Sequence, residues 1–370
     1  MAKHHKQSIP WWKPQLTGKE YSLVKHVLDI NYLNDGDVTR QFEKEVSRLL
    51  KVEYAVAVTS GTIAIYLALK GNGVGPGDEV IVPDVTFIAT ANAVKLAGAK
   101  PVLVDVDPER LTLSPESFKR AITPRTKAII PVHVTGRAAE MEAILEISKL
   151  RHILVVEDAA EAFMSKHNGR FLGTFGIAGC FSFSPHKVIT TGQGGMVVTN
   201  NGQLYKRLRQ LKDQGRDALG TGGDDVHKTV GYNFKLTNLQ AAVGIGQLTE
   251  LTERLNRQKQ IAKLYAQSLQ EVKAIKLLPF DFDSGEIPQW TDAIAENRDK
   301  LDRYLSSHGA ECRRFWFPIH TQAPYKLSDR NFPNSTRVLP HALWLPSAFT
   351  LKDSDILIVC DLIKRFYSRK

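Results

Sequence analysis

Lys187 is the residue of this chain best placed for nucleophilic chemistry. It stands on a Ser-Pro turn between two β-rich runs, with a glycine cluster behind it, in the sequence FSFSPHKVITTGQGGMVVT that runs from Phe181 to Thr199. A lysine amine that is held in place and readily deprotonated can form a Schiff base with a carbonyl compound. The pattern therefore points to pyridoxal phosphate. The alternative is a solvated loop lysine, because most lysines in proteins are exposed.

Acidic residues close a strand-like apolar run upstream of this lysine. The run from His152 reads HILVVEDAAE, so that Glu157, Asp158 and Glu161 follow its apolar residues. Acids at that end lie at the carboxyl edge of a sheet, where α/β proteins bind their ligands. A carboxylate there can keep the pyridine nitrogen of the cofactor protonated, and the protonated ring is the electron sink of this chemistry. For Asp158 the alternative is a helix N-cap.

A third segment changes from strand periodicity to helix periodicity across Ser60-Gly61-Thr62. The free N–H groups of a helix start, together with two hydroxyls, can hold a phosphate. Taken alone, Ser-Gly-Thr is most often an ordinary N-cap. The phosphate turn, the strand that ends on acids and the lysine, in this order, form a more specific pattern.

These segments resemble the DegT/StrS-type nucleotide-sugar aminotransferases, which are pyridoxal phosphate enzymes of fold type I. The resemblance covers nearly the whole chain from Ile9 onward, and within the family it is strongest to the GDP-perosamine synthases. The family motifs are Ser60–Thr62, Gly75–Pro83, Thr86–Asn92, Glu157–Ala160, Ser182–Lys187, Gly194–Met196 and Gly231–Ala242. The segments shared with the perosamine branch are Thr190–Val198, Thr237–Ala242, Arg313–His320 and Leu345–Ser347.

The resemblance implies a cofactor-binding role for each matching residue. Lys187 would bind pyridoxal phosphate covalently and then move a proton between the amino donor's α-carbon and the cofactor. Asp158 would pair with the pyridine nitrogen, and Glu161 would lie beside the ring hydroxyl. Phe87 would cover the ring, although a core phenylalanine would look the same in the sequence. The phosphate would be held by Ser60, Gly61, Thr62 and Ser182.

The resemblance also implies residues that act on the substrate and across a subunit interface. Asn233 and Lys235 match a family loop that reaches the phosphate of the neighbouring subunit, so we expect a homodimer with shared active sites. His320, Arg313 and Trp290 would bind the substrate. For His320 the alternative is a buried, hydrogen-bonded histidine.

The expected reaction is transfer of an amino group from L-glutamate to a nucleotide-linked 4-keto-6-deoxyhexose. The best expected substrate is GDP-4-keto-6-deoxymannose, which would give GDP-perosamine for O-antigen and lipopolysaccharide biosynthesis. A dTDP- or UDP-linked keto sugar is the first alternative, and a pyridoxal phosphate-binding regulatory protein of the same fold is the second. Related sugar dehydratases carry histidine in place of the lysine; here His186 precedes Lys187, so transamination is favoured over dehydration.

Some segments depart from the family pattern. The family's usual Tyr-Gly-Gln/Arg-Pro-type turn appears here as Thr135-Gly136-Arg137-Ala138, and Arg314 replaces a proline expected after Arg313. The stretch from Pro279 to Trp290 matches the family poorly except at Trp290. We expect these changes to affect the substrate more than the reaction.

Composition agrees with a globular enzyme of 370 residues, with 43% hydrophobic and 24% charged residues. We expect a cytoplasmic protein, because no apolar run approaches the length of a membrane span and the first residues lack a signal peptide. Three scattered cysteines predict neither a metal site nor disulfides. The net charge of +10 suggests an anionic partner. The densest basic stretch, Lys206–Lys212, has leucines at helical spacing, which favours an amphipathic helix with a solvated basic face over nucleic-acid binding.

The order of strand-like and helical runs predicts the α/β class. We expect a large, mainly parallel-sheet domain over residues 25–245 that binds the cofactor. We expect residues 246–370 to form a smaller α+β domain, with residues 1–24 packed on it. A long helix from Thr237 towards Leu269 would connect the two, and a helix beginning near Asp355 would close the chain. The strands are expected at Tyr54–Val58, Glu79–Val82, Pro101–Val106, Ala128–Val134, Ile153–Glu157, Gly179–Phe183 and Met196–Thr199.

Overall fold

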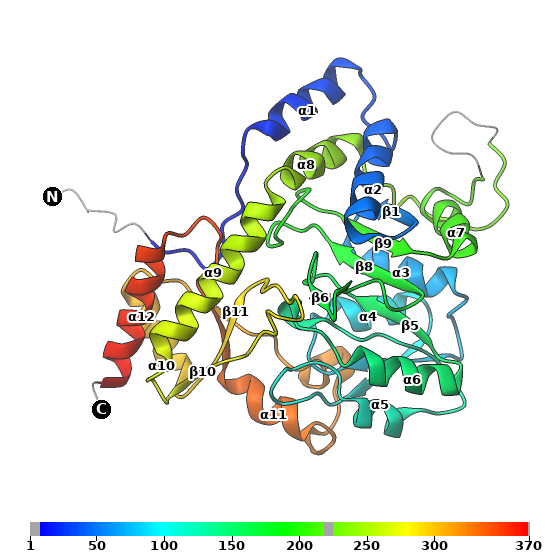
Figure 1. The fold of residues 1–370 in the computed structure, drawn as a ribbon. Helices are drawn as coiled ribbons and strands as arrows, with labels where there is room; N and C mark the ends of the chain where they lie inside the picture. Colours follow the sequence, from blue (N-terminus) through cyan, green and yellow to red (C-terminus); the bar gives the residue numbers. More distant parts are fainter. Residues whose placement is uncertain (1–7, 218–224, 369–370) are drawn as a thin grey trace.

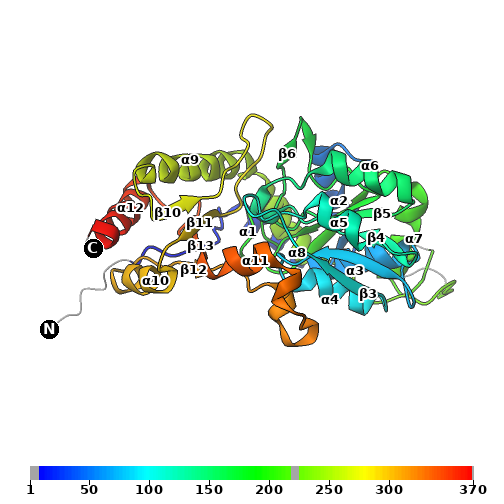
Figure 2. The ribbon, with the colours of Figure 1, turned by 90° about the horizontal axis from the view of Figure 1, so that it is seen from below.

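Two β-sheets and the helices packed on them form the molecule (Figure 1). The structure is a computed structural model that describes residues 8–217 and 225–368. The larger sheet has seven strands and the smaller has four. Seen from below, the smaller sheet lies beside the larger one rather than on top of it (Figure 2).

The seven-stranded sheet has the order β1-β9-β8-β5-β4-β2-β3. All pairs from β8 to β3 are parallel, and β9 and β1 extend the sheet with antiparallel pairs. The predicted α/β class with a mainly parallel sheet is therefore confirmed. The strands are β1 (Tyr54–Val58), β2 (Glu79–Pro83), β3 (Lys100–Val104), β4 (Thr126–Ile129), β5 (Leu154–Asp158), β8 (Ala178–Ser182) and β9 (Gly195–Thr199).

Helices cover both faces of this sheet, because its strands are apolar on both sides. In β1, Val56 and Val58 pack into one hydrophobic core, and Ala55 and Ala57 pack into another, as the two-residue period of a strand requires. The first core is closed by α3 (Gly61–Gly71), α4 (Ala89–Leu96) and α7 (Gly202–Lys212). The opposite face is covered by α2 (Asp37–Leu50), α5 (Pro115–Ala121) and α6 (Met141–Arg151).

Two strands end earlier than the sequence predicts. β3 ends at Val104 rather than Val106, and β4 ends at Ile129 rather than Val134. Residues Val134–Gly136 instead form a short 3₁₀ turn, and Thr135 within it has a left-handed backbone with a φ of 50°. This turn leaves the sheet because it packs against residues 287–292. The contact joins segments far apart in the chain, so no local sequence signal could reveal it.

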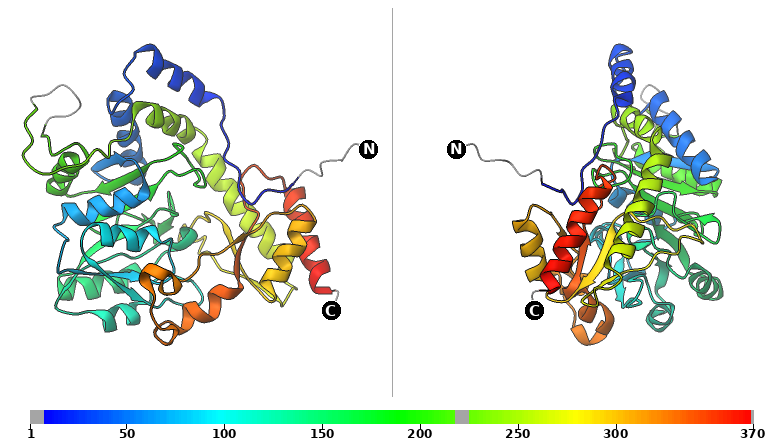
Figure 3. Two further views of the ribbon diagram at one scale, coloured as in Figure 1. Left: turned by 180° about the vertical axis from the view of Figure 1, so that it is seen from behind. Right: turned by 60° about the vertical axis from the view of Figure 1, so that its left-hand side comes forward.

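The four-stranded sheet comes from the C-terminal third of the chain, in the order β10-β11-β13-β12 and with antiparallel pairing throughout. It packs with α9, α10 and α12, and α12 runs beside α9 (Figure 3). Its elements and their neighbours are α9 (Leu251–Leu269), β10 (Ile275–Leu277), β11 (Thr291–Ala295), α10 (Arg298–Ser307), β12 (Arg313–Arg314), α11 (Pro333–Val338), β13 (Ala342–Leu345) and α12 (Asp353–Ser368). A small hairpin, β6 (Lys166–His167) and β7 (Arg170–Phe171), follows β5.

The expected long helix from Thr237 to Leu269 is two helices. α8 (Asn238–Leu248) begins with a capping box of Thr237 and Gln240, and α9 begins at Leu251 after a short break. The side chain of Thr249 donates a hydrogen bond to the carbonyl of Gly246 in the last turn of α8. The prediction of one continuous helix was wrong at this joint. The domain bounds at residues 25, 245 and 246 stay a prediction.

The N-terminal segment contacts the smaller sheet and the turn after β8. Ile9 pairs with Ala310, the carbonyl of Trp11 accepts from the N–H of Ser347 at 3.0 Å, and Trp12 donates to the carbonyl of Pro185 at 3.1 Å. The following helix, α1 (Lys19–Asp29), lies along α8 (Figure 1). Trp11 and Trp12 thus join the small sheet to the turn that carries Lys187.

The basic stretch on α7 turns part of its charge inward. Leu204 and Leu208 are buried, as the helical spacing predicts. Lys212, however, is 1% exposed and pairs with Asp35 at 3.0 Å and Glu43 at 3.1 Å. The predicted amphipathic helix is present, but Lys212 departs from the expected solvated basic face, because Asp35, just before α2, and Glu43, on α2, compensate its charge.

The described residues include no helix long and apolar enough to cross a membrane. The three cysteines are free, and two of them, Cys180 and Cys360, are buried. Within residues 8–217 and 225–368, no group of acidic, histidine or cysteine side chains could hold a metal ion.

Candidate active site

A cavity of about 220 Å³ opens between the carboxyl edge of the large sheet and the small sheet. Its walls are made by segments that lie far apart in the sequence. Most of the sequence-predicted cofactor residues line it, together with two of the three predicted substrate residues. The lining residues are Ser60, Gly61, Thr62, Ile65, Thr86, Phe87, Ala89, Thr90, Val132, Asp158, Ala160, Glu161, Ser182, Ser184, His186, Lys187, Gln193, Trp290, Arg313, Trp316 and Trp344.

Lys187 reaches into this cavity from the turn after β8. Its side chain is 11% exposed, and its Nζ lies 3.1 Å from Oε1 of Glu161 and 5.0 Å from the centre of the Trp290 ring. The N–H of Lys187 donates to the carbonyl of Ser184 at 3.1 Å, so the turn itself is hydrogen-bonded. The amine is therefore held by an acid on one side and an aromatic face on the other.

Asp158 closes the base of the cavity at the end of β5. Oδ2 accepts from the hydroxyl of Thr90 at 2.7 Å, and Oδ1 accepts from the N–H of Ala160 at 3.1 Å. Burial raises the pKa of the Asp158 carboxyl, and the bond from Thr90 opposes that rise. A buried carboxylate whose pKa is raised can bind a protonated ring nitrogen strongly, because little water screens the pair.

Glu161 lies one turn beyond Asp158 and faces Lys187. Oε1 contacts the lysine, and Oε2 accepts from the backbone N–H of Thr135 at 3.1 Å. Burial raises the pKa of the Glu161 carboxyl; Lys187 opposes this rise, and the charge of Asp158 adds to it. Two acids and one lysine thus share a poorly hydrated space, which is a common arrangement for proton transfer.

The start of α3 lines the cavity and offers backbone N–H groups and hydroxyls that could hold a phosphate. Ser60 caps the helix by accepting from the N–H of Ile63, and the N–H groups of the first helical residues point out of the helix end. A side chain at Gly61 would come within 2.9 Å of Ser182, and one at Gly195 within 2.3 Å of the carbonyl of Ser60. The two glycines therefore let the backbone and the hydroxyls close around a small anion.

The residues present thus fit pyridoxal phosphate at each of its reactive positions. An amine, a buried acid, a second acid and an anion cradle line one cavity. Phe87 lies at its rim with 54% of its surface exposed, rather than in the core. This excludes the core alternative for Phe87 and leaves its ring free to cover a ligand.

Arg313 and Trp290 line the same cavity from the smaller sheet. The Arg313 guanidinium lies over the rings of Trp11 at 4.7 Å and Trp344 at 5.7 Å. Trp290 is buried beside the lysine and packs on Trp344. The cavity therefore carries an exposed cation over an aromatic wall, which suits an anionic or sugar-bearing ligand.

His320 does not line the cavity in the described chain. Its side chain is fully buried, with Nδ1 2.6 Å from Oδ2 of Asp84 and its ring stacked on Phe332 at 4.4 Å. Its backbone N–H also donates to Asp84, at 2.7 Å. These contacts favour the alternative interpretation, a buried and hydrogen-bonded histidine.

Asn233 and Lys235 also lie outside the cavity. Asn233 is exposed, and the Nζ of Lys235 pairs with Oδ1 of Asp213 at 2.6 Å. Lys235 also forms a β-bridge with Val58, just before the Ser60 turn. A role at a neighbouring subunit's phosphate stays a prediction, because it concerns a second chain.

Sequence reasoning missed several residues of this site. Thr90 was seen only as part of a motif, although it lies one helical turn after Phe87 and so on the same side of the chain. Trp316 was likewise seen only as part of the segment Arg313–His320, and Trp344 was not singled out, because only the packing of the small sheet brings it to the cavity. Glu157, which could have been chosen instead of Asp158, points away and accepts from His133, Gly173, Phe175 and Gly176.

Comparisons with known proteins agree with this geometry. The model of the DegT/DnrJ/EryC1/StrS aminotransferase family matches residues 14–364. GDP-perosamine synthase from Escherichia coli O157:H7 is 37% identical over 364 residues, covering 98% of this chain and 99% of the relative. A GDP-perosamine synthase from Caulobacter vibrioides is 38% identical over 319 residues, covering 84% and 85%.

Among solved structures, the chain is similar to DesV of S. venezuelae, crystallised with a ketimine intermediate. The TM-score is 0.91 at 32% sequence identity, and the alignment covers 98% of this chain and 99% of the other. Family match, relatives and fold thus agree over nearly the whole length. This protein is a member of the DegT/DnrJ/EryC1/StrS aminotransferase family.

Proposed function

We propose that this enzyme binds pyridoxal phosphate at Lys187 and transfers an amino group from L-glutamate to GDP-4-keto-6-deoxymannose, giving GDP-perosamine. The observation that supports it most is the position of Lys187, whose amine shares one cavity with Asp158 and with the anion cradle at the start of α3. Pyridoxal phosphate supplies an electron sink that stabilises negative charge on the amino donor's α-carbon.

The chain's own residues then have separate roles. Lys187 holds the cofactor and moves a proton to or from the donor's α-carbon. Asp158 keeps a proton on the ring nitrogen, and the bond from Thr90 fixes its carboxylate. Ser60, Gly61, Thr62 and Ser182 hold the phosphate. Glu161 stays beside Lys187 and the ring hydroxyl.

The choice of a nucleotide-linked keto sugar is supported by the names of the relatives and by the cavity wall. Two relatives that share more than a third of their aligned residues with this chain are named GDP-perosamine synthase. Arg313 adds an exposed cation to the cavity lining, which suits a diphosphate. A dTDP- or UDP-linked sugar is the alternative substrate.

A spectrum of the purified protein tests the cofactor assignment. We expect a yellow protein with a visible absorbance band, and we expect glutamate to remove that band as the amino group passes to the cofactor. A protein that stays colourless after incubation with excess pyridoxal phosphate contradicts the proposal. A coloured protein that does not respond to glutamate or other amino acids supports a regulatory protein of the same fold instead.

A panel of GDP-, dTDP- and UDP-linked 4-keto-6-deoxy sugars tests the substrate. The protein is first converted with glutamate, and the return of the visible band with each keto sugar is followed at several concentrations. We expect the GDP sugar to be preferred. A preference of about tenfold or more for a dTDP or UDP sugar corresponds to about 1.4 kcal/mol of discrimination. It would contradict the assignment of GDP-perosamine as the product but not the proposed aminotransferase activity.

A further inference from the structure

Thr135 connects the acid beside Lys187 to the smaller sheet. Its N–H donates to Oε2 of Glu161 at 3.1 Å, and its carbonyl accepts from the N–H of Gln289 at 2.8 Å. Its hydroxyl lies 2.5 Å from Oδ2 of Asp292 and 2.9 Å from the carbonyl of Val134. All three of its polar groups are thus engaged, one towards the cavity and two towards the small-sheet segment. Thr135 is fully buried, so bulk solvent does not reach these bonds.

The backbone of Thr135 needs these bonds to keep its shape. Its φ of 50° is left-handed, a conformation that β-branched residues rarely adopt and that persists only where the surroundings hold it. The next residue, Gly136, has a φ of 99°, and a Cβ there would come within 1.9 Å of the carbonyl of Ile287. The turn is therefore pressed directly against the segment that precedes β11. In this conformation the N–H of Thr135 points at Glu161.

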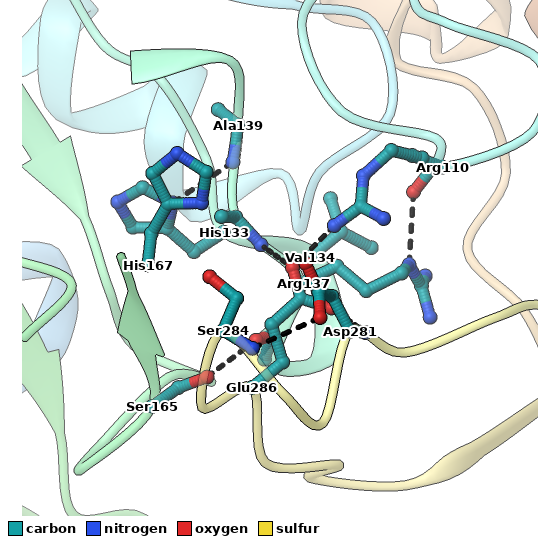
Figure 4. Close-up of polar contacts among 12 residues, drawn as sticks. Arg110, His133, Val134, Arg137, Ala139, Ser165, His167, Asp281, Ser284 and Glu286 are labelled. Atoms are coloured by element: carbon teal, nitrogen blue, oxygen red, sulfur yellow. Dashed lines mark hydrogen bonds and ion pairs between the residues drawn. The ribbon is translucent and has the colours of Figure 1, made fainter. Parts of the chain in front are cut away.

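Arg137 holds the acid that binds the Thr135 hydroxyl. Arg137 is fully buried, and its Nη1 lies 2.5 Å from Oδ2 of Asp292. Its Nε donates to the carbonyl of Arg110 at 3.0 Å, as the dashed line in Figure 4 shows, and its guanidinium lies 5.0 Å from the ring of Phe280. Burial raises the pKa of the Asp292 carboxyl, and Arg137 is the largest influence that opposes this rise.

Glu286 binds the end of the turn formed by residues 135–138. This buried carboxylate accepts from the N–H groups of Ala138 at 2.8 Å and Asp281 at 2.7 Å, and it also contacts Arg110 (Figure 4). The two stretches that depart from the family pattern, residues 135–138 and residues 279–290, therefore contact each other. Both stretches are thus part of one buried hydrogen-bond network.

We propose that Thr135, held by Asp292 and Arg137, is a positioning residue that fixes Glu161 and through it the amine of Lys187. The inference rests on the proposed function, because it assigns a role within the same site. It makes the orientation of the lysine depend on the docking of residues 287–292. A displaced small-sheet segment would release the Thr135 N–H, and Glu161 would lose its second hydrogen-bond partner.

Two substitutions at Thr135 isolate the hydroxyl. Thr135→Ser keeps the bond to Asp292, whereas Thr135→Ala removes it, and neither variant has a branched β-carbon. The first measurement is the rate at which Lys187 captures pyridoxal phosphate in the full chain, trapped with borohydride and quantified by peptide mass spectrometry. The second is the single-turnover rate of the glutamate half-reaction. Thr112→Ala, which removes another buried threonine hydroxyl that does not line the cavity and has no hydrogen-bond partner within the described residues, is the control.

We expect Thr135→Ser to stay within about threefold of the parent and Thr135→Ala to be about tenfold slower in both measurements. Thr112→Ala should match the parent in both. Melting temperatures show whether each variant folds; if Thr135→Ala does not, Thr135→Gly takes its place, since glycine adopts a positive φ without strain.

Equal rates for the serine and alanine variants, whether fast or slow, overturn the positioning role, because the hydroxyl would then have no separate effect. Failure of the parent to capture pyridoxal phosphate at Lys187 overturns the proposed function itself. The two failures are therefore distinguishable in one experiment.

Discussion

At the scale of single residues, Lys187 is both a reagent and a counter-charge. Its amine is proposed to react with the cofactor, and its positive charge compensates the buried carboxylate of Glu161 at 3.1 Å. Removing one partner of a buried ion pair leaves the other charge without compensation. Substitutions at this position therefore change stability as well as chemistry.

Comparing Lys187→Ala with Lys187→Arg separates these two effects. Both variants should lose turnover, because neither offers an amine that can form a Schiff base. Only the alanine variant should also lose stability, since arginine keeps a cation near Glu161. Both should still bind pyridoxal phosphate weakly through the anion cradle. Residual glutamate turnover above the background of the free cofactor in either variant would contradict the assignment of Lys187.

His320→Asn tests whether this histidine supports the fold or the substrate. Because its ring is buried between Asp84 and Phe332, we expect the free energy of unfolding to fall by about 1–3 kcal/mol. The exposed His341→Asn serves as the control. The glutamate and keto-sugar half-reactions should change equally. A loss confined to the keto-sugar half-reaction would instead support the substrate role expected from the sequence.

At the scale of elements, Glu79 ties β2 to its neighbours. Its carboxylate accepts from Thr123 at 2.6 Å, Arg125 at 3.0 Å and Lys100 at 3.2 Å, and it is 2% exposed. The bond from Thr123, with help from the two cations, lowers the pKa of Glu79 from 4.5 to about 2. The stabilisation is fully present above the unfolded value near 4.5 and is lost as the pH falls towards 2.

Glu79→Gln should remove this pH-dependent contribution. We expect the variant to be less stable by about 3 kcal/mol at pH 7 and the difference to shrink steadily below pH 4.5. Urea unfolding of the variant and the parent between pH 3 and 7 measures it. Glu146→Gln, on the exposed side of α6, should show no such trend. A difference that stays constant across this range would contradict the assigned pKa.

The sequence was most informative where structure is decided locally. The apolar runs predict the strands of the large sheet to within a few residues, and Ser60 is the cap of α3 as its neighbours indicate. It was least informative where distant segments meet. Three contacts join residues far apart in the chain. They are Thr90 with Asp158, Lys212 with Asp35, and His320 with Asp84. Such contacts follow from the packing of whole elements, which periodicity does not encode.

At the scale of the whole molecule, the predicted dimer can be tested by exchanging subunits. One chain carries Lys187→Ala, and the other carries Asn233→Ala with Lys235→Ala. Each should be weak alone, but a mixed dimer should contain one intact site, so that free exchange restores activity at about a quarter of all sites. Mass spectrometry of the intact assembly verifies that mixed dimers form. Mixed dimers without restored activity would contradict shared sites.

Trp11 and Trp12 have a further consequence for the order in which the protein can be assembled during its synthesis. Ile9 pairs with Ala310, and the carbonyl of Trp11 accepts from the N–H of Ser347. The N-terminal segment therefore cannot pack in its final position until the C-terminal part of the chain has been synthesised. The large sheet can form while translation continues, because domains fold in the order in which they leave the ribosome. The cluster of Trp11, Trp290 and Trp344 beside Lys187 cannot form at that stage. We expect the indole of Trp11 to stay exposed to water until β13 has been synthesised. We therefore expect the site to be completed only after the segment that contains Ser347 has been synthesised.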